Sequence, residues 1–224
     1  MGIDHLGLFL LAGILLNLTP GPDVLYIVAQ SAKRGLRAGV AAALGIVAGC
    51  FVHIAAAALG VSALLAASTT AFTALKWLGA AYLVWIGWGM IKPHVDINIE
   101  ASGEENLRAT GQIGLKKVFV IGFWTNVLNP KVALFFLAFL PQFISPQAGD
   151  KTLAFVLLGL MFNLNSLWVN LAYAWLGASV GEALGAVASP RWHKLRGQLQ
   201  WVERLAGALF IAFGLKLALT DNPA

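Results

Sequence analysis

Two prolines separated by one glycine lie inside the first hydrophobic stretch, within residues 17–23 (NLTPGPD). Proline has no amide hydrogen and its ring clashes with the preceding turn, so Pro20 and Pro22 predict that a helix is interrupted here. Unpaired backbone groups are costly in hydrocarbon and are tolerated only where protein or a watery cavity satisfies them. The break therefore predicts a site inside a membrane.

A similar pattern returns once, in residues 126–131 (NVLNPK). Thr19 precedes the first proline and Asn129 precedes Pro130, and both are residue types that favour the start of a helix. Interrupted helices in matching positions of two halves indicate the substrate site of a transporter. The alternative is that both prolines only kink packed helices, which is common in membrane proteins.

The composition is that of an integral membrane protein. Hydrophobic residues make up 59% of the chain and charged residues only 11%. About 20 apolar residues are needed to cross a bilayer as a helix. The sequence predicts an all-α, polytopic membrane protein with six transmembrane helices, at residues 5–30, 39–67, 72–91, 117–143, 152–179 and 200–219.

Lysine and arginine are concentrated in the loops after the first, third and fifth spans. Because cytoplasmic loops keep the excess of basic residues, these three loops are predicted inside and both termini outside. The formal charge of +5 is then explained by topology together with attraction to anionic membrane lipid, and it gives no reason to expect nucleic-acid binding. The basic residues that carry this argument are Lys33, Arg34, Arg37, Lys92, Arg108, Lys116, Lys117, Arg191, Lys194 and Arg196.

Three spans in each half is an odd number, so homologous halves would lie in opposite orientations. The expected organisation is a first three-helix repeat at 1–92, a polar cytoplasmic connector at 93–116 and a second, inverted repeat at 117–224. The first helix of each repeat, helix 1 and helix 4 of the chain, is the broken one.

Four motifs together resemble the LysE/RhtB family of amino-acid exporters: residues 17–23, 129–131 (NPK), 135–136 (FF) and 140–143 (LPQF). The resemblance covers essentially the whole chain. It implies a six-helix protein of the cell inner membrane that expels amino acids, driven by the proton gradient, and that acts as a homodimer. Members differ in whether they export neutral or basic amino acids. The wider superfamily includes exporters of metal and other cations, which is the alternative function.

The broken helices suggest how a zwitterion is held. A half-helix that begins at a break presents free N–H groups suited to a carboxylate, and one that ends there presents free carbonyls, at Leu16 and Leu18, suited to an ammonium. Lys131 is deep in a span and could bind the substrate carboxylate, while Asp23 could bind the ammonium or carry a coupling proton. Alternatively, Asp23 and Lys131 form a structural ion pair, or Asp23 only complements the dipole of its own half-helix.

Spans two and five add two patterned faces. His53 lies on a stripe of small residues and is interpreted as a packing residue or a proton relay. Span five carries a polar stripe, which faces either a cavity or another helix; it comprises Asn163, Ser166, Asn170, Tyr173 and Gly177. The candidate substrate-binding residues are Asn17, Thr19, Pro20, Gly21, Pro22, Asp23, Asn126, Asn129, Pro130, Lys131, Asn163 and Asn170.

No motif supports an enzyme, a cofactor or an ATP-driven pump, since catalytic, metal and phosphate-loop patterns are missing from the sequence. Cys50 is the single cysteine, which excludes an internal disulfide. Small residues at Gly177, Gly181 and Gly185 suggest, together with the resemblance, a helix surface for a homodimer.

Overall fold

The computed structural model describes residues 2–19, 21–61, 69–91, 114–145 and 147–184, and nine residues between 204 and 219. Within these ranges the chain is all-helical, with seven α-helices, and the extended backbone is limited to one isolated bridge between Ile3 and Ile144. The predicted connector falls outside the described residues except for 114–116, and so does most of the predicted sixth span.

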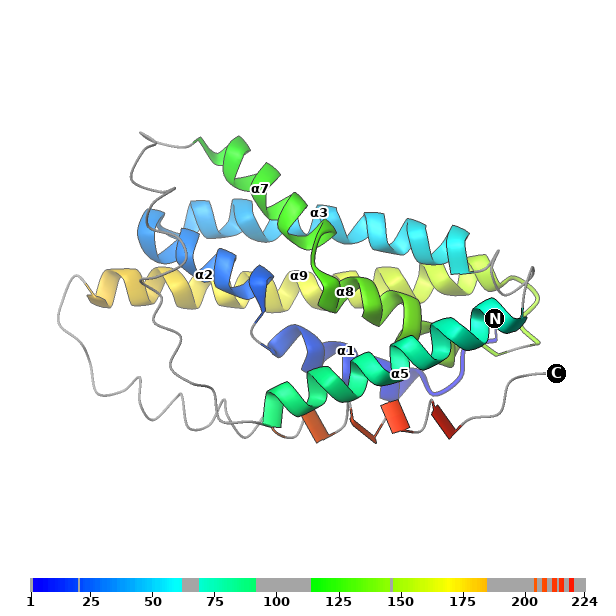
Figure 1. The fold of residues 1–224 in the computed structure, drawn as a ribbon. Helices are drawn as coiled ribbons and strands as arrows, with labels where there is room; N and C mark the ends of the chain where they lie inside the picture. Colours follow the sequence, from blue (N-terminus) through cyan, green and yellow to red (C-terminus); the bar gives the residue numbers. More distant parts are fainter. Residues whose placement is uncertain are drawn as a thin grey trace.

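The first half contains α1 (Leu6–Leu18), α2 (Pro22–Arg34), α3 (Leu36–Ala56) and α5 (Thr69–Ile91), and α3 continues as the π-helix η1 (Ala57–Val61). The second half contains α7 (Leu115–Val127), α8 (Pro130–Leu134), the π-helix η2 (Phe135–Phe139), the 3₁₀-helix η3 (Leu140–Phe143) and α9 (Lys151–Leu184). The helices run roughly along one long direction, as Figure 1 shows.

Both predicted helix breaks are confirmed. The axes of α1 and α2 differ by 51°, and α7 is bent by 46° from the segment Pro130–Phe143. Pro22 is the first residue of α2 and Pro130 the first of α8, where a missing amide hydrogen costs nothing. Pro20 lies outside the described residues.

Two described segments, Leu36–Gly60 and Lys151–Ser179, are each long and apolar enough to cross a membrane. Counting each bent pair as one span raises this to four. The described helices thus agree with the predicted spans one, two, four and five, whereas the full count of six and the inverted relation of the halves stay predictions.

Close helix contacts rest on glycines. A Cβ on Gly45 or Gly49 of α3 would collide with the backbone carbonyls of Phe119 and Phe123 on α7. The contact between α3 and α7 is the most extensive one between any two of the described helices. The small-residue stripe predicted on span two is therefore a helix contact.

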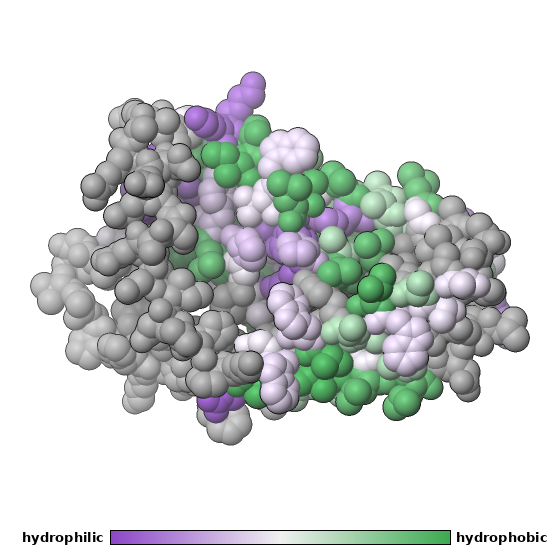
Figure 2. Space-filling model, viewed as in Figure 1, coloured by the Kyte–Doolittle hydropathy of each residue, from purple (hydrophilic) through white to green (hydrophobic). Residues whose placement is uncertain are grey.

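A cluster of phenylalanines fills the interior beside the second break. The rings of Phe135 and Phe162 are 4.6 Å apart between centroids, and Phe136 meets Phe162 edge-on at 5.3 Å. Many large apolar side chains lie on the outside instead, as Figure 2 shows along one face and as expected for contact with lipid.

Candidate functional site

The carbonyl groups at the end of α1 lack their usual helical partners. A helix pairs the carbonyl of residue i with the amide of residue i+4, and for Leu16 and Leu18 that position is a proline, Pro20 or Pro22. Leu16 O receives a 3.2 Å hydrogen bond from Thr19 N. The carbonyls of Leu16, Leu18 and Thr19 also accept hydrogen bonds from side chains of distant helices.

Lys131 supplies one of these side chains. Its Nζ atom donates to Leu16 O at 2.9 Å and to Thr19 O at 2.8 Å. The lysine is placed by the second break, since the side chain of Asn129 caps α8 by accepting from Lys131 N at 3.0 Å. The two helix breaks thus meet, and the carbonyl end of one binds an ammonium carried by the other.

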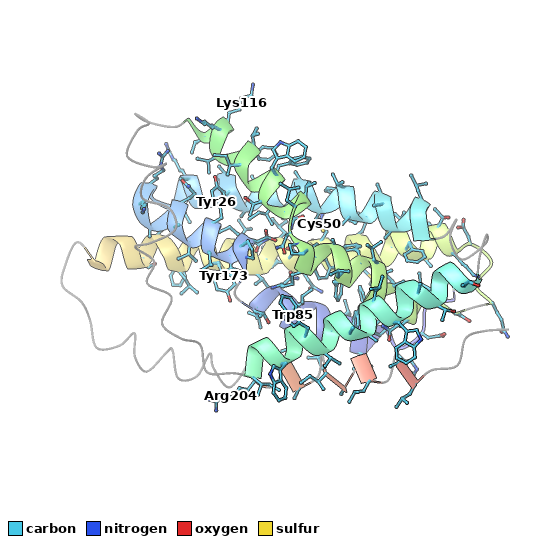
Figure 3. All side chains as sticks on the ribbon, viewed as in Figure 1. Tyr26, Cys50, Trp85, Lys116, Tyr173 and Arg204 are labelled. Carbon is cyan, nitrogen blue, oxygen red and sulfur yellow. The ribbon has the colours of Figure 1, made fainter. Side chains whose placement is uncertain are left out.

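Tyr173 of α9 supplies the second side chain. Its hydroxyl donates to Leu18 O at 2.7 Å. The carbonyls of Leu16 and Leu18, predicted to be free for a substrate ammonium, are thus occupied in this structure by donors of the chain itself. Figure 3 shows Tyr173 on α9 near the middle of the bundle.

Asp23 lies in the first turn of α2, where its charge also complements the helix dipole. Its Oδ2 atom accepts a hydrogen bond of 2.8 Å from Asn126 Nδ2 at the end of α7. The backbone oxygen of Asn126 in turn lies 2.9 Å from His53 Nε2. Among the described residues no ion pair joins Asp23 to Lys131: the carboxylate bonds to the amide of Asn126, and the ammonium bonds to backbone carbonyls.

A small cavity lies between the two breaks and α9. It has about 10 Å³ open to the centre of a water molecule, which is room for about one water. Residues of α1, α2, α7, α8 and α9 contribute to its wall: Leu16, Asn17, Gly21, Asp23, Val24, Asn126, Lys131, Val132, Phe162, Ser166 and Asn170.

Several polar atoms at this place are buried without a hydrogen-bond partner. Asp23 Oδ1 and Asn126 Oδ1 are free acceptors, and Asn17 Nδ2 and Asn129 Nδ2 are free donors. Buried polar groups are normally paired. Unpaired donors and acceptors around one cavity are typical of a site that is completed by a polar ligand.

The polar stripe of α9 divides between the two predicted environments. Ser166 and Asn170 line the cavity and bond to each other, Asn170 Nδ2 donating to Ser166 Oγ at 3.1 Å. Asn163 donates instead to Val47 O of α3 at 3.2 Å, and Gly177 packs against α2 at Val28 and Ser31.

Six of the predicted site residues line the cavity: Asn17, Gly21, Asp23, Asn126, Lys131 and Asn170. Thr19 contributes its carbonyl to Lys131, while its hydroxyl bonds back to Leu15 O at 2.8 Å. Asn129 caps α8 beside the cavity. Pro22 and Pro130 begin helices, and Asn163 contacts α3; none of these three lines the cavity.

Five of the lining residues are not among the predicted substrate-binding residues. Leu16 carries one of the predicted free carbonyls, and Ser166 belongs to the predicted polar stripe. Val24, Val132 and Phe162 carry no sequence signal that separates them from other apolar residues of a membrane span.

One of the two arguments for a homodimer, the small residues on the fifth span, is wrong. Gly177 and Gly181 are packed against α2 of the same chain, where a Cβ on Gly181 would meet Ala32. These two glycines therefore do not form a free surface, and Gly185 lies outside the described residues. Among the described residues, no group of three or more His, Cys, Asp and Glu side chains could hold a metal ion.

Comparison with known proteins places these features in a family. The chain is 34% identical over 220 residues to an uncharacterized membrane protein of Pseudomonas aeruginosa, covering 97% of this chain and 96% of that protein. It is 30% identical over 210 residues to a homoserine/homoserine lactone efflux protein of Salmonella typhimurium, covering 94% of each. A leucine efflux protein of Enterobacter is 27% identical over 220 residues, covering 97% of this chain and 96% of that protein.

No solved structure matches the chain significantly. The family model described as LysE type translocator matches residues 14–221, which contain both helix breaks and every residue that lines the cavity. The chain belongs to the LysE type translocator family.

Proposed function

We propose that this protein exports amino acids, as zwitterions, from the cytoplasm across the cell inner membrane. The observation that carries the proposal is the convergence of the two helix breaks on one cavity, where backbone carbonyls bind an ammonium beside a carboxylate. Such a site offers a partner for each charge of an amino acid. The names of the relatives, homoserine/homoserine lactone efflux and leucine efflux, support this substrate class.

The polar atoms of the site divide into two groups by charge preference. Asp23 Oδ1 and the carbonyls at the end of α1 suit the substrate ammonium, because they accept hydrogen bonds. The ammonium of Lys131 and the unpaired amide nitrogens of Asn17 and Asn129 suit the substrate carboxylate. Ser166 and Asn170 are left to contact polar atoms of the substrate side chain.

The apolar part of the wall suggests an uncharged substrate side chain. Leu16, Val24, Val132 and Phe162 line the cavity, and Asp23 is the single carboxylate among its described lining residues. A basic side chain would need a second carboxylate. We therefore favour neutral amino acids over basic ones.

The cavity must widen before an amino acid can enter, since it has room for about one water. The structure is thus a closed state of the proposed cycle. The bends between α1 and α2 and between α7 and α8 are the places where a half-helix can tilt without breaking helical hydrogen bonds. Alternating access to a central site is the usual mechanism for broken-helix transporters.

Asp23 is the proposed proton carrier. Its carboxylate lies in the wall of the cavity, bonded to Asn126 and near His53. Protonation would remove the charge that holds the substrate ammonium, so proton binding from outside favours release there. This links the proton gradient to export.

The experiment that tests the function is an export assay. Cells expressing the protein are grown against a panel of toxic amino acids and peptides, and extracellular amino acids are measured in parallel. One class of neutral amino acid is expected to accumulate selectively outside the cells, and collapse of the proton gradient should abolish this accumulation. Equal accumulation in cells with and without the protein would reject amino-acid export, whereas resistance to a metal salt alone would favour the cation alternative.

Both termini are proposed to lie outside. Lys33 and Arg34 end α2, Lys116 and Lys117 begin α7, and Figure 1 shows these two helix ends at the same end of the molecule. That distribution supports a cytoplasmic location for them. Labelling of a cysteine introduced at Ala224 from outside the cell is expected, and labelling only after permeabilisation would reject the orientation.

A homodimer in the lipid bilayer is also proposed, on the family resemblance alone. The mass of the protein extracted in native lipid is expected to correspond to two chains. A single chain at physiological abundance would reject the dimer.

A further inference from the structure

The end of α1 already holds a primary ammonium. Lys131 Nζ donates to Leu16 O at 2.9 Å and to Thr19 O at 2.8 Å. The lysine reaches these carbonyls from another broken helix, and at Leu16 it takes an acceptor position that residue 20, a proline, cannot fill. The same chemical group is present in every free amino acid.

Further acceptors lie around the same place without partners. Asp23 Oδ1 and Asn126 Oδ1 are buried and unpaired, and both residues line the cavity together with Leu16 and Lys131. Asn126 is only 2% exposed. The carbonyls that hold Lys131 thus lie beside a cavity whose wall also carries the unpaired carboxylate oxygen of Asp23, a further acceptor for N–H donors.

We propose that the carbonyls of Leu16 and Thr19 form a primary-ammonium subsite, which Lys131 occupies while the site is empty. This inference rests on the proposed function and names how the substrate is recognised. The substrate carboxylate pairs with the ammonium of Lys131 and draws it off the carbonyls, because a contact between two charged groups is stronger than one with a neutral carbonyl. The substrate amino group then takes the vacated place.

The exchange keeps the backbone at the break hydrogen-bonded in both states. Unpaired carbonyls within a membrane cost several kcal/mol each, and here one ammonium replaces another. Lys131 thus closes the empty site and binds the carboxylate in the filled one.

The subsite also defines the substrate class. A site built around hydrogen-bond acceptors rejects an analogue that lacks the donor, since the acceptors are then left unpaired. Amino acids with a free primary amino group are accepted. Their 2-hydroxy and N-acetyl analogues with the same side chain are excluded.

The decisive experiment restores the ammonium chemically. Lys131→Ala removes Cγ, Cδ, Cε and Nζ, which together have the composition of n-propylammonium. The melting temperature of the purified variant is measured in detergent against increasing n-propylammonium chloride. A saturable rise is expected for Lys131→Ala, with no rise for the unmodified protein, whose own lysine fills the subsite, or for Lys116→Ala, in which an exposed lysine is lost.

Tetramethylammonium is the matched probe, because it has the same charge and no N–H donor. Equal effects of the two cations on Lys131→Ala, an equal effect on Lys116→Ala, or no rise at all would overturn the subsite. If Lys131→Ala does not accumulate, Lys131→Met keeps the side chain as far as the position of Cε, and ammonium chloride is tested on it by the same criteria.

This measurement needs no transport, so its failure is separate from failure of the proposed function. Rescue by n-propylammonium without export of any amino acid would uphold the subsite and reject the function. In the unmodified protein, an excess of the 2-hydroxy analogue should leave export of the corresponding amino acid unchanged. Competition equal to that of the amino acid itself would contradict the subsite.

Discussion

The Oδ2 atom of Asp23 accepts a 2.8 Å hydrogen bond from Asn126 Nδ2, which joins the first turn of α2 to the end of α7. The two residues are separated by 103 positions in the chain and belong to different helix breaks. On its other side, Asn126 contacts α3: its backbone oxygen lies 2.9 Å from His53 Nε2. Asp23 is therefore in direct contact with the second break.

Replacing Asp23 by Asn tests this carboxylate. Asparagine keeps the shape and can still accept from Asn126, but it carries neither a charge nor a titratable proton. Gradient-driven export should fall to background at unchanged abundance in the membrane, whereas substrate exchange without a gradient is retained at least in part. Asp4→Asn, at an exposed carboxylate, is the control and should export normally. Normal export by Asp23→Asn would remove Asp23 from the mechanism.

Lys131→Met keeps the aliphatic part of the side chain and removes the ammonium. The apparent affinity for the exported amino acid should weaken tenfold or more, which is about 1.4 kcal/mol or above, because a charged contact with the carboxylate is lost. Lys116→Met is the control. An unchanged affinity in Lys131→Met would show that the lysine does not contact the substrate.

The double variant of Asp23→Asn and Lys131→Met separates function from a structural ion pair. A buried pair whose partners are removed together usually recovers the stability that each single change costs. Since no ion pair between the two residues is found in the described part of the chain, no recovery of abundance is expected, and export should stay at background. Normal export by the double variant would show that the two residues have only a structural role.

Tyr173→Phe removes the hydroxyl that fills the carbonyl of Leu18. A buried acceptor left unpaired costs about 1–3 kcal/mol, so the melting temperature in detergent should fall. Tyr26→Phe is a matched control, because Tyr26 donates to Val118 O at 2.9 Å in the interior of α7, where the helix itself provides an amide partner. An equal fall in the melting temperature of Tyr26→Phe would show that the helix break is irrelevant to the effect.

Gly49→Ala tests the contact between α3 and α7. A Cβ at this position would meet the backbone carbonyl of Phe123 and approach Asn126 Cβ at 3.0 Å. Overpacking of this kind costs about 1–3 kcal/mol, and here it also displaces the partner of Asp23. Both thermal stability and export should decrease. At Gly7 an added Cβ meets nothing within 4 Å, so Gly7→Ala should change neither.

Much of the fold could be predicted from the sequence because proline acts locally. A proline cannot donate to the carbonyl four residues before it, whatever the surroundings, so the breaks at residues 17–23 and 126–131 followed from the residue types alone. The polar stripe on α9 was also predictable, since the helical repeat places its members on one face. Which of them would meet a cavity and which a helix was left open.

The partners across the site could not be predicted. The sequence offered a substrate carboxylate or Asp23 as the partner of Lys131, and it did not predict the contacts of the ammonium with the carbonyls of Leu16 and Thr19. Apolar lining residues such as Phe162 had no distinguishing signal, and Gly177 and Gly181 were assigned to a dimer surface although they pack on α2. In each case the partner is far away in the chain.

The sequence by itself determined that this protein is a helical membrane protein with two interrupted helices, because hydrophobicity and missing amide hydrogens are properties of the residues themselves. Only the tertiary structure decided that the lysine of the second break satisfies the carbonyls of the first, and that Tyr173 satisfies Leu18. The physical reason is that a carbonyl left unpaired in a low-dielectric interior is costly and needs a hydrogen-bond donor, but which donor reaches it depends on how the helices pack.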